Sequence, residues 1–240
     1  MCIIHNNNNK ILYLYLYLYI RDIYIMIVLF GDSHTASFVI ENNTQYMTPD
    51  EVLIKNKFFS SFRTWPYTCY NINNKKQIIF DFLNKLNLTS NDIVFFSFGE
   101  SDIRCHIGFN SNNEIEQYNL IQTIINNYIT LLAEIKDNFK FKVGCYGPIA
   151  SGIHNGPNGN DGIPSYSNCI ERNKITFKFN NILKEMCKKN NFIYKDIFRH
   201  LINGKMETKH ELYCDKIHLG VQTQPLLVEE FSDIIKLYAN

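Results

Sequence analysis

The sequence has almost no excess charge of either sign, which argues against one large class of functions. It contains 24 Lys and Arg against 23 Asp and Glu, for a net charge of +1. The basic residues are scattered along the chain, so the electrostatic footprint of a nucleic-acid-binding protein is absent. We therefore expect no nucleic-acid partner.

Cysteine pairs at disulfide or metal spacing are also lacking. The chain has seven cysteines, an odd number, and no Cys-x-x-Cys motif. A disulfide framework is therefore not expected, and a reducing compartment, the cytoplasm, fits better. The set Cys105, His106, Asp215 and His218 matches no standard zinc spacing, so we expect no metal ion. No motif implies a cofactor.

No uninterrupted apolar run is long enough to span a bilayer. Residues 11–20 alternate Leu and Tyr over only ten positions, whereas a spanning helix needs about 20. Extending the run crosses Arg21 and Asp22, and no small-residue cleavage site follows, although a signal peptide or anchor stays open as the alternative. We expect no stable membrane span, a poorly ordered extension over residues 1–24 and a folded domain over residues 25–240.

The chain does contain an alternation of buried strands and amphipathic helices. Continuous apolar runs predict strands over residues 25–30, 93–98, 141–147 and 191–197. Apolar residues at i, i+3, i+4 spacing predict helices over residues 75–87, 113–137 and 170–190 and a final helix after His218. This alternation predicts a single doubly wound α/β domain with a central parallel sheet. In such folds ligands bind beyond the carboxyl ends of the strands.

Residues suited to nucleophilic catalysis lie at such positions. Ser33 follows the first predicted strand directly, in Gly31-Asp32-Ser33, and a serine hydroxyl needs a base to react. His218 is a candidate base, and Asp215, three residues earlier, is a candidate partner that orients it. Each pair alone is common, for example as a turn or a helix cap, but together they favour a triad. The G-x-S-x-G elbow of the α/β-hydrolases is absent.

In these segments the chain resembles the SGNH (GDSL-type) hydrolases. The Gly-Asp-Ser block at Ser33 and the Asp-x-x-His block at His218 match that family, and residues 99–102 stand where it has G-x-N-D. The resemblance spans residues 25–238. It implies a flavodoxin-like three-layer fold, with Ser33 as nucleophile and Asp215 and His218 as the other triad members.

Two departures from the family concern the oxyanion hole. Ser101 replaces the family's Asn, and the family's second-block glycine is missing, since no glycine lies between Gly31 and Gly99. The segment Arg63–Thr68 is the candidate for that block. An oxyanion hole that lacks one donor typically loses about 10²–10³ in rate. The backbone N–H of Ser33 is one expected donor, and the other candidate oxyanion- or substrate-binding residues are Asp32, His34, Gly99, Ser101 and Arg104.

Other polar residues allow two interpretations each. Glu100 and Asp102 resemble a paired-carboxylate site, but a helix cap or an ion pair with Arg104 is favoured. His106 either binds substrate or is structural. Residues 156–162 lack the ending of a phosphate loop and are expected to form a rim or lid. Three aromatic residues are candidates for stacking on a sugar, or for the core: Trp65, Tyr67 and Tyr166.

The resulting expectation is a serine esterase that acts on an acyl ester, of a carbohydrate by analogy with glycan-modifying relatives. One alternative is a glycan O-acyltransferase that uses the same triad. Another is a catalytically silent relative that binds a glycan or partner. A flavodoxin-like nucleotide binder is disfavoured because the first strand lacks a phosphate-binding glycine loop. The partner is thus expected to be a small-molecule or glycan ester, and nothing indicates an oligomeric state.

Overall fold

The structure is a computed structural model that describes residues 26–38, 53–55, 59–64, 67–152 and 165–238. The predicted extension over residues 1–24 and the predicted rim or lid over residues 156–162 lie outside the described residues, as does Trp65.

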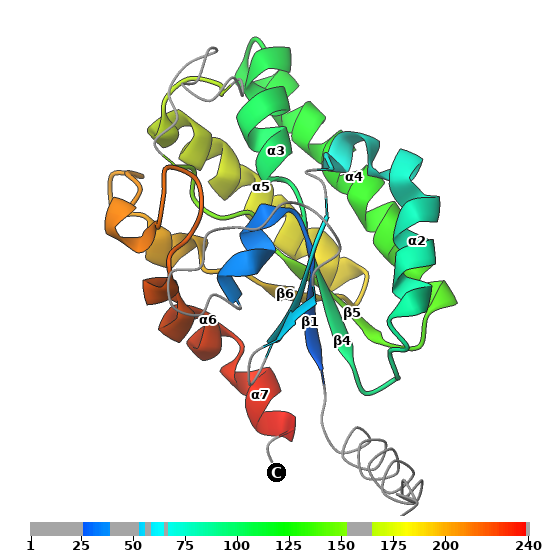
Figure 1. The fold of residues 1–240 in the computed structure, drawn as a ribbon. Coiled ribbons are helices and arrows are strands. Elements are labelled where there is room, and N and C mark those ends of the chain that lie inside the picture. The colour runs from blue at the N-terminus through cyan, green and yellow to red at the C-terminus, as the bar shows by residue number, and fades with distance from the viewer. Residues whose placement is uncertain (1–25, 39–52, 56–58, 65–66, 153–164, 239–240) are drawn as a thin grey trace, which may run out of the picture.

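A six-stranded sheet forms the centre of the described residues, in the order β2-β3-β1-β4-β5-β6 (Figure 1). Its strands are β1 (Ile27–Gly31), β2 (Leu53–Lys55), β3 (Phe59–Arg63), β4 (Ile93–Ser97), β5 (Lys142–Tyr146) and β6 (Ile193–Lys195). The strands from β3 to β6 in this order run parallel, and β2 pairs antiparallel with β3 at the edge. The predicted central parallel sheet is confirmed.

Strand β1 is apolar throughout because both of its faces are covered. Ile27 and Leu29 pack into one hydrophobic cluster, while Val28 and Phe30 pack into the other. This division follows from the two-residue repeat of a strand, which points successive side chains to opposite faces. A run without polar alternation is thus typical of a strand between two helix layers.

Helices cover both faces of the sheet, which makes the fold a three-layer α/β/α arrangement (Figure 1). One face packs against α2 (Lys76–Lys85), α4 (Glu114–Asn138) and α5 (Cys169–Lys189). The other packs against α6 (Gln224–Glu230), α7 (Ser232–Tyr238) and the 3-10 helix Ser33–Phe38. The predicted final helix is therefore two helices, separated at the buried Phe231.

Strand β3 is missing from the sequence-based prediction. The apolar pattern predicts no strand between residues 34 and 62, yet β3 pairs with β1 along its whole length. Two buried serines at its centre, Ser60 and Ser61, interrupt the apolar run. A five-residue strand with a polar centre has no period that distinguishes it from a loop.

The strand order creates a switch point beside β1. The chain places β3 on one side of β1 and then crosses to place β4 on the other. Connections that leave neighbouring strands in opposite directions open a crevice beyond the carboxyl ends of those strands. Ser33 follows β1 and Glu100 follows β4, so both lie at this crevice.

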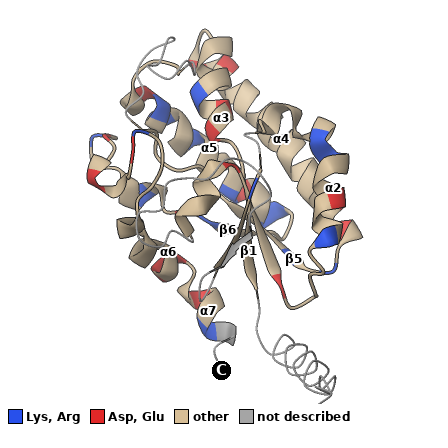
Figure 2. Cartoon of the chain, in the orientation of Figure 1, with Lys and Arg blue, Asp and Glu red and all other residues tan. Residues whose placement is uncertain are grey.

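Lys and Arg are interspersed with Asp and Glu over the described elements (Figure 2). Within the same part of the chain, no helix combines the length and the apolar character that crossing a lipid bilayer requires.

Candidate active site

Gly31 brings the end of β1 close to the end of β4. A Cβ at this position would collide with the backbone carbonyl of Ser97, so a side chain does not fit there. The carbonyl of Gly31 accepts hydrogen bonds from the backbone N–H and the hydroxyl of Thr64, at 2.6 and 3.1 Å. Asp32 then accepts the backbone N–H of His34 at 3.0 Å, and this turn starts a 3-10 helix at Ser33. The Ser33 side chain is thereby held beyond the carboxyl end of β1.

The structure brings Ser33, His218 and Asp215 together. The Ser33 hydroxyl lies 2.9 Å from Nε2 of His218, although the two residues are 185 positions apart. Nδ1 of His218 lies 2.7 Å from Oδ2 of Asp215. Oδ1 of Asp215 accepts the backbone N–H groups of Ile217 and His218, both at 2.6 Å. With its proton on Nδ1, toward the carboxylate, His218 has Nε2 available to accept the serine proton.

The surroundings of His218 suit a base that is neutral near pH 7. Burial lowers the pKa of His218 below its ordinary 6.5, and the nearby His34 lowers it further. Asp215 raises this pKa but offsets only part of the decrease. Burial would raise the pKa of Asp215, but hydrogen bonds from His218 and Ile217 hold it below 3.8. The pair therefore consists of a neutral imidazole and an ionised carboxylate, as general-base chemistry requires.

Gly99 joins β4 to the short helix α3 (Glu100–Asp102). Its φ of +117° is a conformation that residues with a side chain rarely adopt, and a Cβ there would lie 2.8 Å from Pro148. Asp102, fully buried, accepts the backbone N–H groups of Cys69 and Tyr70 at 2.7 and 3.0 Å. Asp102 therefore caps the 3-10 helix Cys69–Lys75, and burial raises its pKa to about 7.

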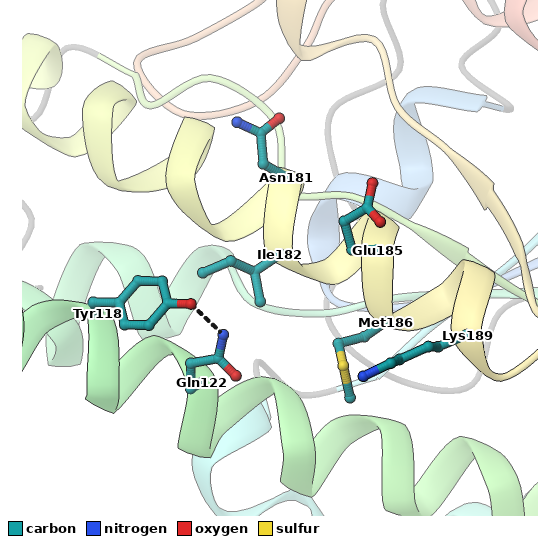
Figure 3. A pocket seen from close by; sticks show the side chains of 7 residues that line it. All are labelled: Tyr118, Gln122, Asn181, Ile182, Glu185, Met186 and Lys189. Atoms are coloured by element: carbon teal, nitrogen blue, oxygen red, sulfur yellow. Dashed lines mark hydrogen bonds between the residues drawn. The ribbon is translucent and has the colours of Figure 1, made fainter.

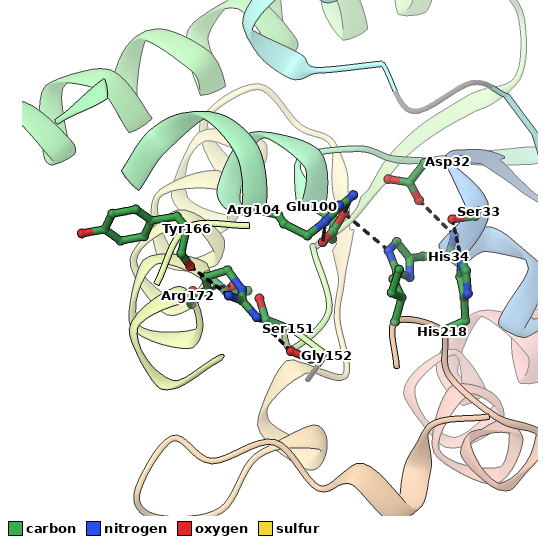
Figure 4. Close-up of polar contacts among 12 residues, drawn as sticks. Asp32, Ser33, His34, Glu100, Arg104, Ser151, Gly152, Tyr166, Arg172 and His218 are labelled. Carbon is green, nitrogen blue, oxygen red and sulfur yellow. Dashed lines mark hydrogen bonds and ion pairs between the residues drawn. The ribbon is translucent and has the colours of Figure 1, made fainter. Parts of the chain in front are cut away.

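Glu100 links Arg104 to His34 (Figure 4). Arg104 donates from Nε and one Nη to the two carboxylate oxygens of Glu100, at 2.7 and 3.1 Å. The second of those oxygens lies 3.7 Å from Nε2 of His34. Burial would raise the pKa of Glu100, but Arg104 lowers it well below 4.5. Asp102 therefore acts as a helix cap and Glu100 as the partner of Arg104 in an ion pair, which is the favoured one of the two interpretations given above.

Comparison with known proteins gives no match to any protein-family model and no match among curated proteins. Solved structures do match. A Bacteroides fragilis protein assigned as an acylhydrolase aligns over 90% of this chain and 88% of its own, with 16% identity and a TM-score of 0.58. A Bacteroides thetaiotaomicron GDSL-like lipase covers 88% and 87%, with 11% identity and a TM-score of 0.55. A Geobacillus stearothermophilus acetylxylan esterase covers 88% and 94%, with 13% identity and a TM-score of 0.52.

The fold is that of the SGNH (GDSL-type) hydrolases. The flavodoxin-like three-layer arrangement implied by the resemblance is thus confirmed. At these identities the likeness shows the fold, and the chemistry has to be argued from the site.

Within the SGNH fold, the two departures concern positions around Ser33. Ser101 is buried in the first turn of α3, directly after the β4–Gly99 turn. Thr64, in the candidate second-block segment Arg63–Thr68, follows β3 and donates two hydrogen bonds to the carbonyl of Gly31. Because β3 was not predicted from the sequence, the position of Thr64 beside Gly31 was not predicted either.

Tyr67, Tyr166 and His106 make ring contacts with neighbouring side chains. Tyr67 stacks on Phe98 with ring centres 6.3 Å apart, and the Lys75 ammonium lies 5.7 Å from its ring. Tyr166 packs edge-on against Phe109 at 5.5 Å. His106 lies 4.5 Å from the ring of Tyr70, and its Nδ1 contacts Asn110. Among the described residues, no three His, Cys, Asp or Glu side chains gather as metal ligands would.

A surface hollow of about 430 Å³ lies between α4 and α5 (Figure 3). Tyr118, Gln122, Ile182 and Met186 are among its lining residues. Figure 3 shows the Tyr118 hydroxyl accepting a hydrogen bond from Gln122, at 3.0 Å. None of the triad or oxyanion candidates lines this hollow, so it is separate from the crevice at Ser33.

Proposed function

We propose that the protein is a serine esterase that cleaves an acyl ester through an acyl-serine intermediate. The observation that carries this proposal is the hydrogen-bond chain from the Ser33 hydroxyl through both nitrogens of His218 to Asp215. Its position at the switch point of the sheet, where α/β folds bind ligands, supports the same reading. A nucleophile, a base and an orienting carboxylate in this order are the parts that acyl transfer needs.

In the first half-reaction the Ser33 Oγ attacks the ester carbonyl carbon while His218 Nε2 takes the hydroxyl proton. The carbonyl oxygen becomes an oxyanion. When the C–O bond to the alcohol breaks, His218 returns the proton to the leaving alkoxide and an acyl-serine is left. Asp215 stays ionised and stabilises the imidazolium that forms between these two events.

In the second half-reaction a water molecule attacks the acyl-serine carbonyl and His218 takes its proton. The tetrahedral intermediate collapses, the C–O bond to Ser33 breaks, and His218 returns the proton to the serine oxygen. The acid product leaves. Each step uses groups of the chain, the ester and water.

The oxyanion is proposed to bind the backbone N–H of Ser33 and the hydroxyl of Ser101. Ser101 supports this role by its place, because it follows β4 in the first turn of α3 and β4 pairs with the strand that carries Ser33. Arg104 is less suited because Nε and one Nη already bind Glu100. A hole with a serine in place of the usual Asn stabilises the oxyanion less, since a removed donor costs about 10²–10³ in rate.

The substrate class proposed is the ester of a carbohydrate. The similarity to an acetylxylan esterase supports it. Product analysis with a sugar acceptor present separates the two outcomes of the shared acyl-serine: release of free acid supports hydrolysis, while an acylated sugar supports transfer.

The first test is hydrolysis of p-nitrophenyl acetate by wild type, Ser33→Ala and His218→Ala. Loss of the nucleophile or the base is expected to lower kcat/KM by about 10⁴-fold or more. Two exposed residues outside the site supply matched controls, Ser90→Ala and His200→Ala. The proposal is contradicted if Ser33→Ala turns over at the wild-type rate. It is also contradicted if an active-serine phosphonate labels wild type and Ser33→Ala equally.

A further inference from the structure

A second histidine lies beside the triad. His34 follows Ser33 in the chain, and its ring centre is 5.4 Å from that of His218, with the planes at 42°. Its side chain is only 5% exposed. Because buried charges are screened much less than exposed ones, a charge on His34 acts strongly on His218.

The groups around His34 favour its charged form. Asp32, on its own segment, accepts its backbone N–H. Glu100, on α3, lies 3.7 Å from Nε2, and Arg104, one turn further on, is bound to Glu100. Nδ1 has no hydrogen-bond partner among the described residues, so Glu100 is the side chain that holds the ring. Burial alone would lower the pKa of His34, but the Asp32 and Glu100 carboxylates raise it above 6.5.

Some groups around His218 favour its charged form and others disfavour it. Asp215, on its own loop, favours the imidazolium. His34, from the segment after β1, and Arg63, at the end of β3, are cations that disfavour it, in addition to burial. Figure 4 shows Arg104, Glu100, His34 and His218 following one another across the site.

We propose that His34 is a positioning residue for the general base: held as an imidazolium by Glu100, it keeps His218 unprotonated in mildly acidic solution. Esterase activity then extends to lower pH than His218 and Asp215 alone would permit. The consequence for activity rests on the proposed function, whereas the effect on the protonation of His218 does not.

The expected size of the effect follows from Coulomb's law. Two unit charges at the 5.4 Å ring separation shift a pKa by roughly half a unit at the dielectric constant of water. The shift is about two units at the effective value of 20 typical of protein sites. Removing the charge on His34 should therefore raise the pKa of His218 by about half a unit or more.

The test is an NMR titration of the full chain with isotope-labelled imidazole rings. The wild type has seven histidines, and the His218 resonances are assigned by their loss in His218→Gln. In His34→Gln, which removes the charge and keeps a polar side chain, the pKa of His218 should rise by half a unit or more. The exposed His200→Gln is the control and should leave it unchanged. An equal His218 pKa in wild type and folded His34→Gln overturns the proposal.

Two further measurements extend the test, and the first of them needs only the wild type, so it also covers the case in which His34→Gln does not fold. In wild type, the His218 resonances should titrate below pH 6.5 and should also respond in the higher range where His34 titrates. A His218 pKa at or above 6.5, or no such response, overturns the proposal. If His34→Gln folds, the acid limb of its kcat/KM profile should move to higher pH by the same amount as the NMR pKa. A wild type without hydrolysis would refute the proposed function while the NMR result still decides the role of His34.

Discussion

At the scale of single residues, Asp215 uses its two carboxylate oxygens for different purposes. Oδ1 accepts two backbone N–H groups of its own turn, which fixes the path of the loop. Oδ2 faces Nδ1 of His218 and fixes the tautomer of the ring. Only the Oδ2 contact with His218 bears on the chemistry. A substitution that keeps the Oδ1 contacts and changes the Oδ2 contact therefore measures the effect of Oδ2 alone.

Asp215→Asn provides that substitution. The amide oxygen can still accept the backbone N–H groups, while the NH₂ group faces Nδ1 and favours the tautomer with the proton on Nε2, which cannot accept the Ser33 proton. We expect kcat/KM to fall by about 10²- to 10⁴-fold. The melting temperature should change little, because the Asp215 side chain is 45% exposed. Wild-type kinetics in Asp215→Asn would mean that the residue only shapes the loop.

At the scale of secondary-structure elements, the site depends on how β4 passes into α3. Gly99 makes this turn with a φ of +117°, and the turn sets the position of the buried residues Glu100, Ser101 and Asp102. Asp102 then ties α3 to the helix that begins at Cys69. The orientation of three polar side chains therefore rests on one glycine.

Gly99→Ala should destabilise the protein, because the new Cβ meets Pro148 at 2.8 Å and Phe179 at 3.1 Å in a strained conformation. Strain of this kind costs about 1–3 kcal/mol. Gly204→Ala is the matched control, since a Cβ there has nothing within 4 Å, and it should stay within about 0.5 kcal/mol of wild type. Urea unfolding of the three proteins measures both, and equal stability of both variants would remove Gly99 from this role.

At the scale of the whole molecule, Lys and Arg are interspersed with Asp and Glu along the described elements (Figure 2), and four buried ionisable residues follow the two central strands. Asp32, His34, Glu100 and Asp102 are all less than a tenth exposed and all follow β1 or β4. Burying charges is costly unless they are paired. The stability of the fold should therefore depend on pH through this group.

Glu100 allows the sign of that dependence to be worked out. Its folded-state pKa lies below the ordinary 4.5, so its stabilising contribution is complete above about pH 4.5 and is lost as the pH falls through the folded-state value. Glu100→Gln should lower the free energy of unfolding at pH 6 by about 3–5 kcal/mol, since it leaves Arg104 unpaired.

The same variant should also show a shallower loss of stability below pH 4.5 than wild type. Urea unfolding at several pH values tests this, with Glu185→Gln, an exposed carboxyl on α5, as control. Parallel curves for wild type and Glu100→Gln would contradict the assignment.

The sequence by itself determined the elements whose signals are local. Strand β1, helix α4 and the turn at Ser33 follow from apolar period and turn chemistry, and these depend on residues close together in the chain. The candidate nucleophile, base and carboxylate were also found this way, because Asp215 lies three residues before His218 and Ser33 follows a buried strand.

Only the tertiary structure decided which distant residues meet. Strand β3 forms because β1 offers it an edge for pairing. The polar centre of β3 gives no sign of this pairing in the sequence. Glu100 lies 3.7 Å from His34 because β1 and β4 are neighbours in the sheet. His34 lies beside His218 because the chain, 185 positions after the adjacent Ser33, returns to the same edge. Such contacts are set by strand order and packing across the sheet, and a one-dimensional pattern contains neither.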